Sequence, residues 1–228
     1  MVIARIIAID GPAASGKSTV GRRLAEFLGY LYFDTGVMYR AITWVAIEQG
    51  VSVDAEDLIV ELAYHTDIDV QPPSVDDGRA YNVIVNGRDV TWKIRRPQVD
   101  ANVSVVSTYA GVRKALTEQQ RRIGLRGKVV MVGRDIGTVV LPEADLKIFL
   151  VATAEERARR RQAELLMRGE QASYEEILES MQKRDRIDST RLLAPLKPAK
   201  DAVILDSDDL TIEEVLEFIK KLAVRLCV

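Results

Sequence analysis

A glycine-bounded loop near the N-terminus constrains this chain more than any other feature. The run from Gly11 to Ser18 directly follows the apolar stretch Ile6 to Ile9 and leads into an amphipathic pattern that extends to Leu28. Glycines at both ends of such a loop let the backbone curl so that successive N–H groups point inward, and the following helix adds the positive end of its dipole. The spacing therefore predicts a strand, a phosphate-binding loop and a helix in immediate succession.

The loop matches a Walker A motif, which predicts contacts for its polar side chains. Lys17 is placed to reach the β- and γ-phosphates of a nucleotide, and the Ser18 hydroxyl to ligate Mg²⁺. A simple glycine-rich turn is the alternative, but the flanking strand and helix patterns favour the nucleotide site. We predict that the nucleotide is bound by Gly11, Pro12, Ala13, Ala14, Ser15, Gly16, Lys17, Ser18 and Thr19.

Composition narrows the class of protein. The chain has 228 residues, 47% of them hydrophobic and 29% charged, which is typical of one globular domain with a sizeable core. The formal net charge of −2 gives no general attraction to nucleic acid or to a membrane surface. Without a signal segment or a membrane-spanning run, we expect a cytoplasmic protein. The single cysteine, Cys227, excludes an intramolecular disulfide, and the single histidine, His65, excludes a two-histidine metal site.

Five apolar runs alternate with helical patterns, which predicts an α/β fold. The runs are Arg5 to Asp10, Tyr30 to Phe33, Val129 to Val132, Lys147 to Val151, and Ala202 to Leu205. Continuous apolar strands that each lead into a helix are typical of a parallel sheet covered on both faces. Capping-box spacing, which marks a helix start, occurs at Thr153/Glu156, Ser173/Glu176 and Thr211/Glu214.

Two segments depart from this alternation. In the first, from about Tyr64 to Ser104, Asn86-Gly87 lies between two short β-prone runs, so we expect a hairpin in a small antiparallel sheet. Pro97 then suits the first turn of a helix that runs toward Val106. The second segment, from about Ala154 to Arg191, is helical and rich in arginine.

Polar residues follow the carboxyl ends of two predicted strands. One group holds Asp34, Thr35, Tyr39 and Arg40, and the other holds Gly133, Arg134 and Asp135. Because parallel strands end at one edge of the sheet, where ligands bind, we expect both groups near Lys17. The alternatives are a solvated arginine at a strand–helix corner and a structural salt bridge between Arg134 and Asp135.

Each of the two arginine-rich helices predicts a stripe of charged side chains. The stripes are Arg157, Arg160 and Arg161 on the first helix, and Arg184, Asp188 and Arg191 on the second. The first would neutralise charge on transferring phosphates, and the second suits a ribose and a phosphate. Local pairing is the alternative, through Glu155, Glu156 and Glu164 on the first helix and between Arg184 and Asp188 on the second.

The chain offers a phosphate cradle and many arginines but no obvious general base. An acceptor that is itself a phosphate monoester fits this pattern, because it is already anionic and needs no deprotonation. An alcohol acceptor would require a positioned carboxylate as base.

Together with Arg184-Asp185 and Ala194-Pro195-Leu196, these motifs resemble those of the bacterial cytidylate kinases, a P-loop nucleoside monophosphate kinase family, over nearly the whole chain. The resemblance implies a P-loop three-layer fold with a five-stranded parallel sheet flanked by helices, an inserted small antiparallel β lobe and a helical lid. It implies a core of about residues 1–34, 105–152 and 192–228, a monophosphate-binding lobe of about 35–104, and a lid with its following helix at about 153–191.

The resemblance also implies substrates and roles. ATP would donate its γ-phosphoryl group, with Mg²⁺, to CMP or dCMP, in a monomer without nucleic-acid or membrane partners. Catalysis would rest on Lys17 and the lid arginines Arg157, Arg160 and Arg161. The substrate-binding residues would be Thr35, Ser104, Arg113 and Asp135 at cytosine; Tyr39, Arg184 and Asp188 at the ribose; and Arg40, Arg134 and Arg191 at the acceptor phosphate, with Gly133 beside them. A P-loop kinase for UMP, AMP or a small alcohol, and a regulatory nucleotide-binding module, are the alternatives.

Overall fold

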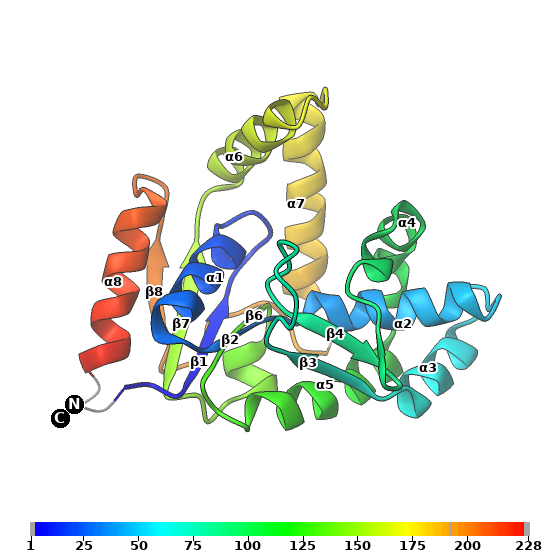
Figure 1. The fold of residues 1–228 in the computed structure, drawn as a ribbon. Coiled ribbons are helices and arrows are strands. Elements are labelled where there is room, and N and C mark those ends of the chain that lie inside the picture. The colour runs from blue at the N-terminus through cyan, green and yellow to red at the C-terminus, as the bar shows by residue number, and fades with distance from the viewer. Residues whose placement is uncertain (1–2, 192, 226–228) are drawn as a thin grey trace.

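Five parallel strands form the central sheet of the computed structural model, which describes residues 3–191 and 193–225 (Figure 1). In spatial order they are β2 (Leu31–Asp34), β6 (Val129–Gly133), β1 (Ile6–Asp10), β7 (Leu146–Val151) and β8 (Val203–Asp206). The α/β prediction is confirmed, and each predicted strand agrees with an observed one to within one residue at either end. Cys227 lies outside the described residues.

Helices cover both faces of this sheet, which gives the predicted three layers. Gly21 of α1 (Lys17–Leu28) approaches Val130 and Val132 on one face, and α8 (Ile212–Arg225) packs beside α1. Gly124, at the end of α5 (Ala110–Gly124), approaches Met131 on the other face. Successive side chains of a strand point to opposite faces, so β6 is buried between helices on both faces of the sheet.

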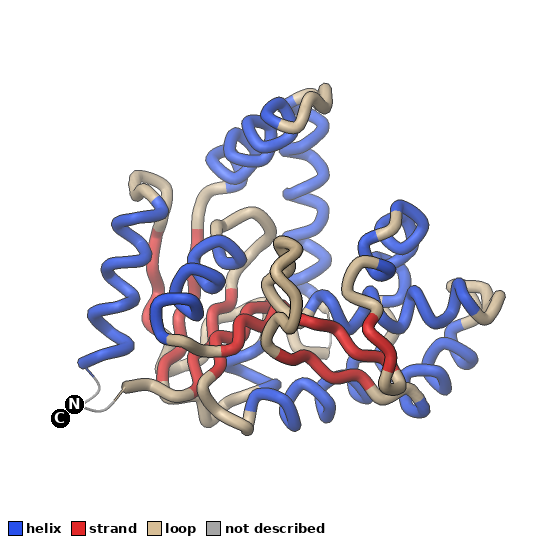
Figure 2. Tube along the Cα trace, in the orientation of Figure 1, coloured by secondary structure: helices blue, strands red, loops and turns tan. Residues whose placement is uncertain are grey.

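The inserted sheet is antiparallel and lies beside the parallel sheet (Figure 2). Its strands are β3 (Ile68–Gln71), β4 (Asn82–Val85) and β5 (Arg88–Asp89). Asn86 and Gly87 join the last two strands with φ of 47° and 77°, as a tight hairpin of this hand requires, so the hairpin prediction is confirmed.

Four helices surround the insert and the strand ends. They are α2 (Gly36–Glu48), α3 (Glu56–His65), α4 (Pro97–Val106) and the already named α5, with a short 3₁₀ turn at Lys93–Arg95. Pro97 is the first residue of α4, as predicted. Helix α4 packs on α2, and α3 packs on α5, so the insert is fixed to the helices that follow the strand ends.

Helices α6 (Ala154–Met167) and α7 (Tyr174–Thr190) pack against each other and project away from the sheet (Figure 1). The three predicted capping boxes mark real helix starts, since the hydroxyls of Thr153, Ser173 and Thr211 accept hydrogen bonds from backbone N–H groups three residues on. Within the described residues no helix has the length and apolar character needed to cross a bilayer.

Candidate active site

The phosphate loop connects β1 to α1 and has the predicted curled backbone. Gly11 has a φ of 149°, and a Cβ there would lie 2.0 Å from the Leu150 carbonyl oxygen. Gly16 has a φ of 90° and precedes the first turn of α1. Only glycine fits both demands, close approach and left-handed backbone, so the loop shape follows from these two positions.

Lys17 is folded back over the loop. Its side chain is buried, and Nζ donates to the carbonyl oxygen of Pro12 and to Ser15 Oγ at 3.3 Å. Burial, followed by the positive charge of Arg134, lowers the pKa of Lys17 well below its usual range. A buried ammonium in this position is stabilised by an anion, which is what a phosphate chain supplies.

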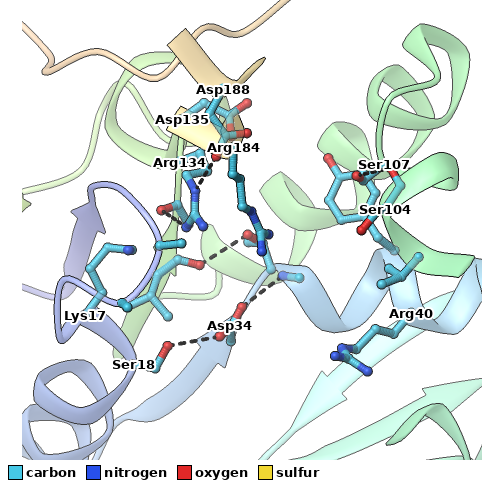
Figure 3. Close-up of a pocket in the computed structure, with 18 of the residues that line it drawn as sticks. Lys17, Ser18, Asp34, Arg40, Ser104, Ser107, Arg134, Asp135, Arg184 and Asp188 are labelled. Atoms are coloured by element: carbon cyan, nitrogen blue, oxygen red, sulfur yellow. Dashed lines mark hydrogen bonds and ion pairs between the residues drawn. The ribbon is translucent and has the colours of Figure 1, made fainter. Parts of the chain in front are cut away.

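Ser18 and Asp34 present two oxygen ligands side by side. Ser18 Oγ lies 3.3 Å from Asp34 Oδ2, and the other carboxylate oxygen of Asp34 accepts the N–H of Gly36 at 3.0 Å (Figure 3). Oxygen donors of this kind fit Mg²⁺, which keeps several waters and takes other ligands from substrate phosphates. No cluster of three or more histidine, cysteine or acidic side chains suited to a metal occurs within residues 3–191 and 193–225.

A cavity of about 600 Å³ opens from the loop toward α2, α4 and α5. Its lining brings together all the substrate-binding residues expected from the sequence: Thr35, Tyr39, Arg40, Ser104, Arg113, Gly133, Arg134, Asp135, Arg184, Asp188 and Arg191. In Figure 3, Arg40 and Ser104 lie on one side of this cavity, across from Arg134 and Asp188.

Most ion pairs between the charged residues of this cavity join different elements. Asp135 Oδ2 accepts from Arg113 Nη2 at 3.0 Å, in a pair that is 10% exposed on each side. Asp188 accepts from Arg134 Nε at 2.9 Å and lies 3.5 Å from Arg191 Nη1. The alternative of an Arg134–Asp135 salt bridge is therefore wrong.

Several donors in this cavity are left over. Arg113 Nε and Arg191 Nη2 are buried without a hydrogen-bond partner among the described residues, the latter 3.8 Å from Asp135 Oδ1. The local Arg184–Asp188 pair is likewise absent from the ion pairs of the described chain. Burial and the nearby Arg113 lower the pKa of Arg191. Unmatched guanidinium donors of this kind fit an anionic ligand with further acceptors.

Sequence reasoning missed Asp100 and Val103 of α4 and Ser107, which directly follows this helix. Asp100 Oδ1 lies 2.5 Å from Arg40 Nη1, which also donates to the Ile94 carbonyl oxygen at 3.2 Å. Helix α4 brings these residues to α2 from the far side of the insert, and no local pattern in the sequence announces that contact.

A second cavity, of about 830 Å³, lies on the other side of the phosphate loop. The loop from Ala13 to Thr19 lines it, as do the apolar side chains of Leu165, Ile177 and Met181 from α6 and α7. Both cavities include Lys17 and Ser18 in their lining. The two spaces thus adjoin at the residues expected to hold transferring phosphates.

The three lid arginines differ in their surroundings. Arg160 Nε contacts Glu156 at 3.0 Å and Arg161 Nη1 contacts Glu164 at 2.7 Å, so local pairing holds for both; both also line the second cavity.

Arg157 lies in neither cavity lining. It is 3% exposed, pairs with both oxygens of Asp185 at 3.1 and 2.5 Å, and donates to the carbonyl oxygens of Ala152 and Ala13 at 3.0 and 3.1 Å. It therefore ties α6 to α7 and to the phosphate loop. The three arginines therefore do not share one environment: Arg157 is enclosed, whereas Arg160 and Arg161 line the second cavity.

Comparisons with known proteins agree with this geometry. The family model described as "Cytidylate kinase" matches residues 7–225. The curated "Cytidylate kinase" of Herpetosiphon aurantiacus is 48% identical over 219 residues, covering 96% of this chain and 94% of its own. That of Chloroflexus aggregans is 53% identical over 211 residues, covering 92% and 90%. A solved gluconokinase structure from Sinorhizobium meliloti has a TM-score of 0.50 at 16% identity over 99% of this chain and 95% of its own, which shows a shared fold alone.

Proposed function

Because the chain belongs to the cytidylate kinase family and is an ATP-dependent phosphotransferase acting on CMP, we propose that the two cavities hold its two nucleotides. CMP would occupy the cavity of about 600 Å³ and ATP that of about 830 Å³. The observation that carries this assignment is the shared lining by Lys17 and Ser18. A γ-phosphoryl group on one side and an acceptor phosphate on the other would then meet at Lys17.

The cytosine base is assigned to the Arg113–Asp135 end of the cavity. Among the described residues, Asp135 Oδ1 accepts no hydrogen bond, so it is free to accept from the exocyclic N4 amine of cytosine. Arg113 donates to N3 or O2, with the hydroxyls of Thr35 and Ser104 nearby. Uracil would set an acceptor oxygen against the carboxylate and leave buried polar groups unpaired, which disfavours UMP.

The acceptor phosphate is assigned to Arg40, Arg134 and Arg191, and the ribose to Tyr39, Arg184 and Asp188. Arg134 and Arg191 share Asp188 as counter-ion, so one carboxylate orients two guanidiniums that a dianionic phosphate would then bridge. We include dCMP as a substrate, because the cytosine contacts do not involve the 2′ position.

Transfer follows from alignment and charge neutralisation. An oxygen of the CMP phosphate forms a bond to the γ-phosphorus of ATP while the bond to the β–γ bridging oxygen breaks, giving CDP and ADP. Lys17 stabilises the transferring group, and Arg160 and Arg161 approach it from the lid. Mg²⁺, held by Ser18 directly and by Asp34 through water, would neutralise phosphate charge when bound.

The division into parts and the setting of the protein are also proposed. Residues of about 35–104 form the monophosphate-binding lobe and about 153–191 the lid, which excludes water when it closes on the substrates. We propose a cytoplasmic monomer. The net charge of −2 gives no general attraction to nucleic acid, which supports the absence of nucleic-acid partners.

Two substitutions test the acceptor site. Asp135→Asn and Arg113→Met should each raise the KM for CMP by about 10- to 100-fold and change the KM for ATP less than about twofold, since each removes one buried polar partner of the base. Arg122→Met is the matched control: Arg122 lies on α5 like Arg113, but pairs with Asp67 at 2.8 Å away from the cavity.

The readout is coupled ADP release with CMP, dCMP, UMP, AMP or no acceptor. Unchanged CMP kinetics in both cavity variants, or an equal effect of Arg122→Met, would contradict the assignment of this cavity to CMP.

A further inference from the structure

Asp10 is a buried carboxylate that lies between the phosphate loop and the turn that follows β6. It ends β1 and directly precedes Gly11, the first glycine of the phosphate loop. In the sheet it pairs with Gly133 on one side and Phe149 on the other, and it is 4% exposed. No cavity lining includes it, so it meets neither nucleotide site directly.

Both oxygens of Asp10 bind the turn that follows β6. Oδ1 accepts the N–H of Ile136 at 2.8 Å, and Oδ2 accepts the N–H of Gly137 at 2.7 Å. Charge-assisted bonds of this length are among the stronger hydrogen bonds in proteins. The two N–H groups begin a π-helical turn over Ile136–Val140, whose positive end therefore faces the carboxylate.

The same turn fixes Asp135. The carbonyl oxygen of Asp135 accepts the N–H groups of Val139 at 2.9 Å and Val140 at 3.1 Å, so the backbone of Asp135 is held by the turn that Asp10 binds. A Cβ at Gly137 would lie 3.5 Å from Asp10 Oδ2, so the carboxylate and the turn are in close contact. Asp10, at the start of the phosphate loop, thus sets the position of Asp135 in the proposed CMP cavity.

We propose that Asp10 is a positioning residue for the acceptor nucleotide, acting through Asp135. This inference rests on the proposed contact of Asp135 with cytosine. Displacement of the turn by a fraction of an ångström would move the Asp135 side chain off its partners, while the phosphate loop keeps its own glycine-determined shape.

The charge state of Asp10 supports a role other than stability. Burial, the largest cause, raises its pKa to about 6, and the negative charge of Asp135 acts in the same direction. The two backbone hydrogen bonds lower the pKa but do not outweigh burial. An ionised carboxylate here costs free energy of folding at neutral pH. The hydrogen bonds of Asp10 to the turn form despite this cost in folding free energy, which fits a residue that serves the geometry of the site.

The chain supplies a matched control at the other end of the same strand. Asp145 Oδ2 accepts the N–H groups of Arg5 and Ile6, both at 2.8 Å, and this exposed carboxylate lies at the edge of the sheet opposite the phosphate loop. Asp145→Asn therefore removes the same kind of two-bond contact to β1 without touching the turn.

The test compares Asp10→Asn with Asp145→Asn in full-length protein. We expect Asp10→Asn to raise the KM for CMP about tenfold with the KM for ATP little changed, and Asp145→Asn to change neither KM. Gly137→Ala adds a Cβ 3.2 Å from Lys147 Cδ and 3.5 Å from Asp10 Oδ2. It should displace the same turn and repeat the selective effect, and it replaces Asp10→Asn if that variant does not fold.

A double-mutant cycle separates this inference from the proposed site. If Asp10 acts through Asp135, then Asp10→Asn should have less than about a twofold further effect on the KM for CMP in an Asp135→Asn background. Additive effects, a KM for CMP that Asp10→Asn leaves unchanged, or an equal rise in both KM values overturns the positioning role. If Asp135→Asn alone leaves the KM for CMP unchanged, the proposed cytosine site itself is wrong.

Discussion

Replacement of Arg157 by methionine should lower the free energy of unfolding and have a smaller effect on kcat. Arg157 is 3% exposed and gives up four hydrogen bonds in this variant, two to Asp185 and two to backbone carbonyls. Removal of one partner of a buried pair costs about 3–5 kcal/mol, and because Asp185 is 29% exposed and partly solvated, we expect about 3 kcal/mol. That is a large share of the roughly 5–15 kcal/mol of a typical domain.

The assay is urea unfolding followed by circular dichroism, beside steady-state kinetics on the same preparations. Arg157→Met/Asp185→Leu should regain part of the loss, since it removes the unpaired carboxylate as well. Arg159→Met is the control, because Arg159 lies on the same helix but is 66% exposed. Wild-type stability in Arg157→Met together with a large fall in kcat would refute the structural role and restore the catalytic one.

Two further results are expected from the start of the phosphate loop. The pKa of Asp10 is about 6 in the folded chain against an ordinary value of 3.8, so the folded state binds more protons than the unfolded state between these pH values. The contribution of Asp10 to the free energy of unfolding is therefore full below about pH 4 and falls by about 3 kcal/mol as the pH rises through 6. Asp10→Asn should remove this pH dependence from urea midpoints measured at pH 4 to 8. An unchanged slope in the variant would contradict the assignment of this pH dependence to Asp10. Gly11→Ala should raise the KM for ATP at least about tenfold in the same ADP-release assay, since its Cβ would meet the Leu150 carbonyl oxygen at 2.0 Å; wild-type ATP kinetics would contradict the close approach.

Local signals made the strands, the phosphate loop and the hairpin predictable. The apolar runs located every strand of the parallel sheet, and the glycine pair at 11 and 16 specified the loop because few other residues tolerate its backbone. Asn86-Gly87 specified the hairpin for the same reason. Each of these features depends on residues within a few positions of one another, so the sequence states them directly.

The edge of the sheet where the site lies was also predictable, but its ion pairs were not. Residues after parallel strands must share one edge, and Asp34 and Arg134 do line one cavity there. Helical spacing placed Arg157 on a face of α6 without saying what that face meets, and its partner Asp185 lies 28 residues away.

The sequence by itself therefore determined the fold class, the phosphate loop and the side chains that follow the strand ends into the cavity of about 600 Å³, because backbone propensity and strand order act locally or by simple topology. Only the tertiary structure decided which partner each charged side chain meets: Arg157 meets Asp185, and Arg40 meets Asp100. Asp10 meets the N–H groups of Ile136 and Gly137. The physical reason is that an ion pair depends on distances of a few ångströms between segments whose approach is set by the packing of the whole chain.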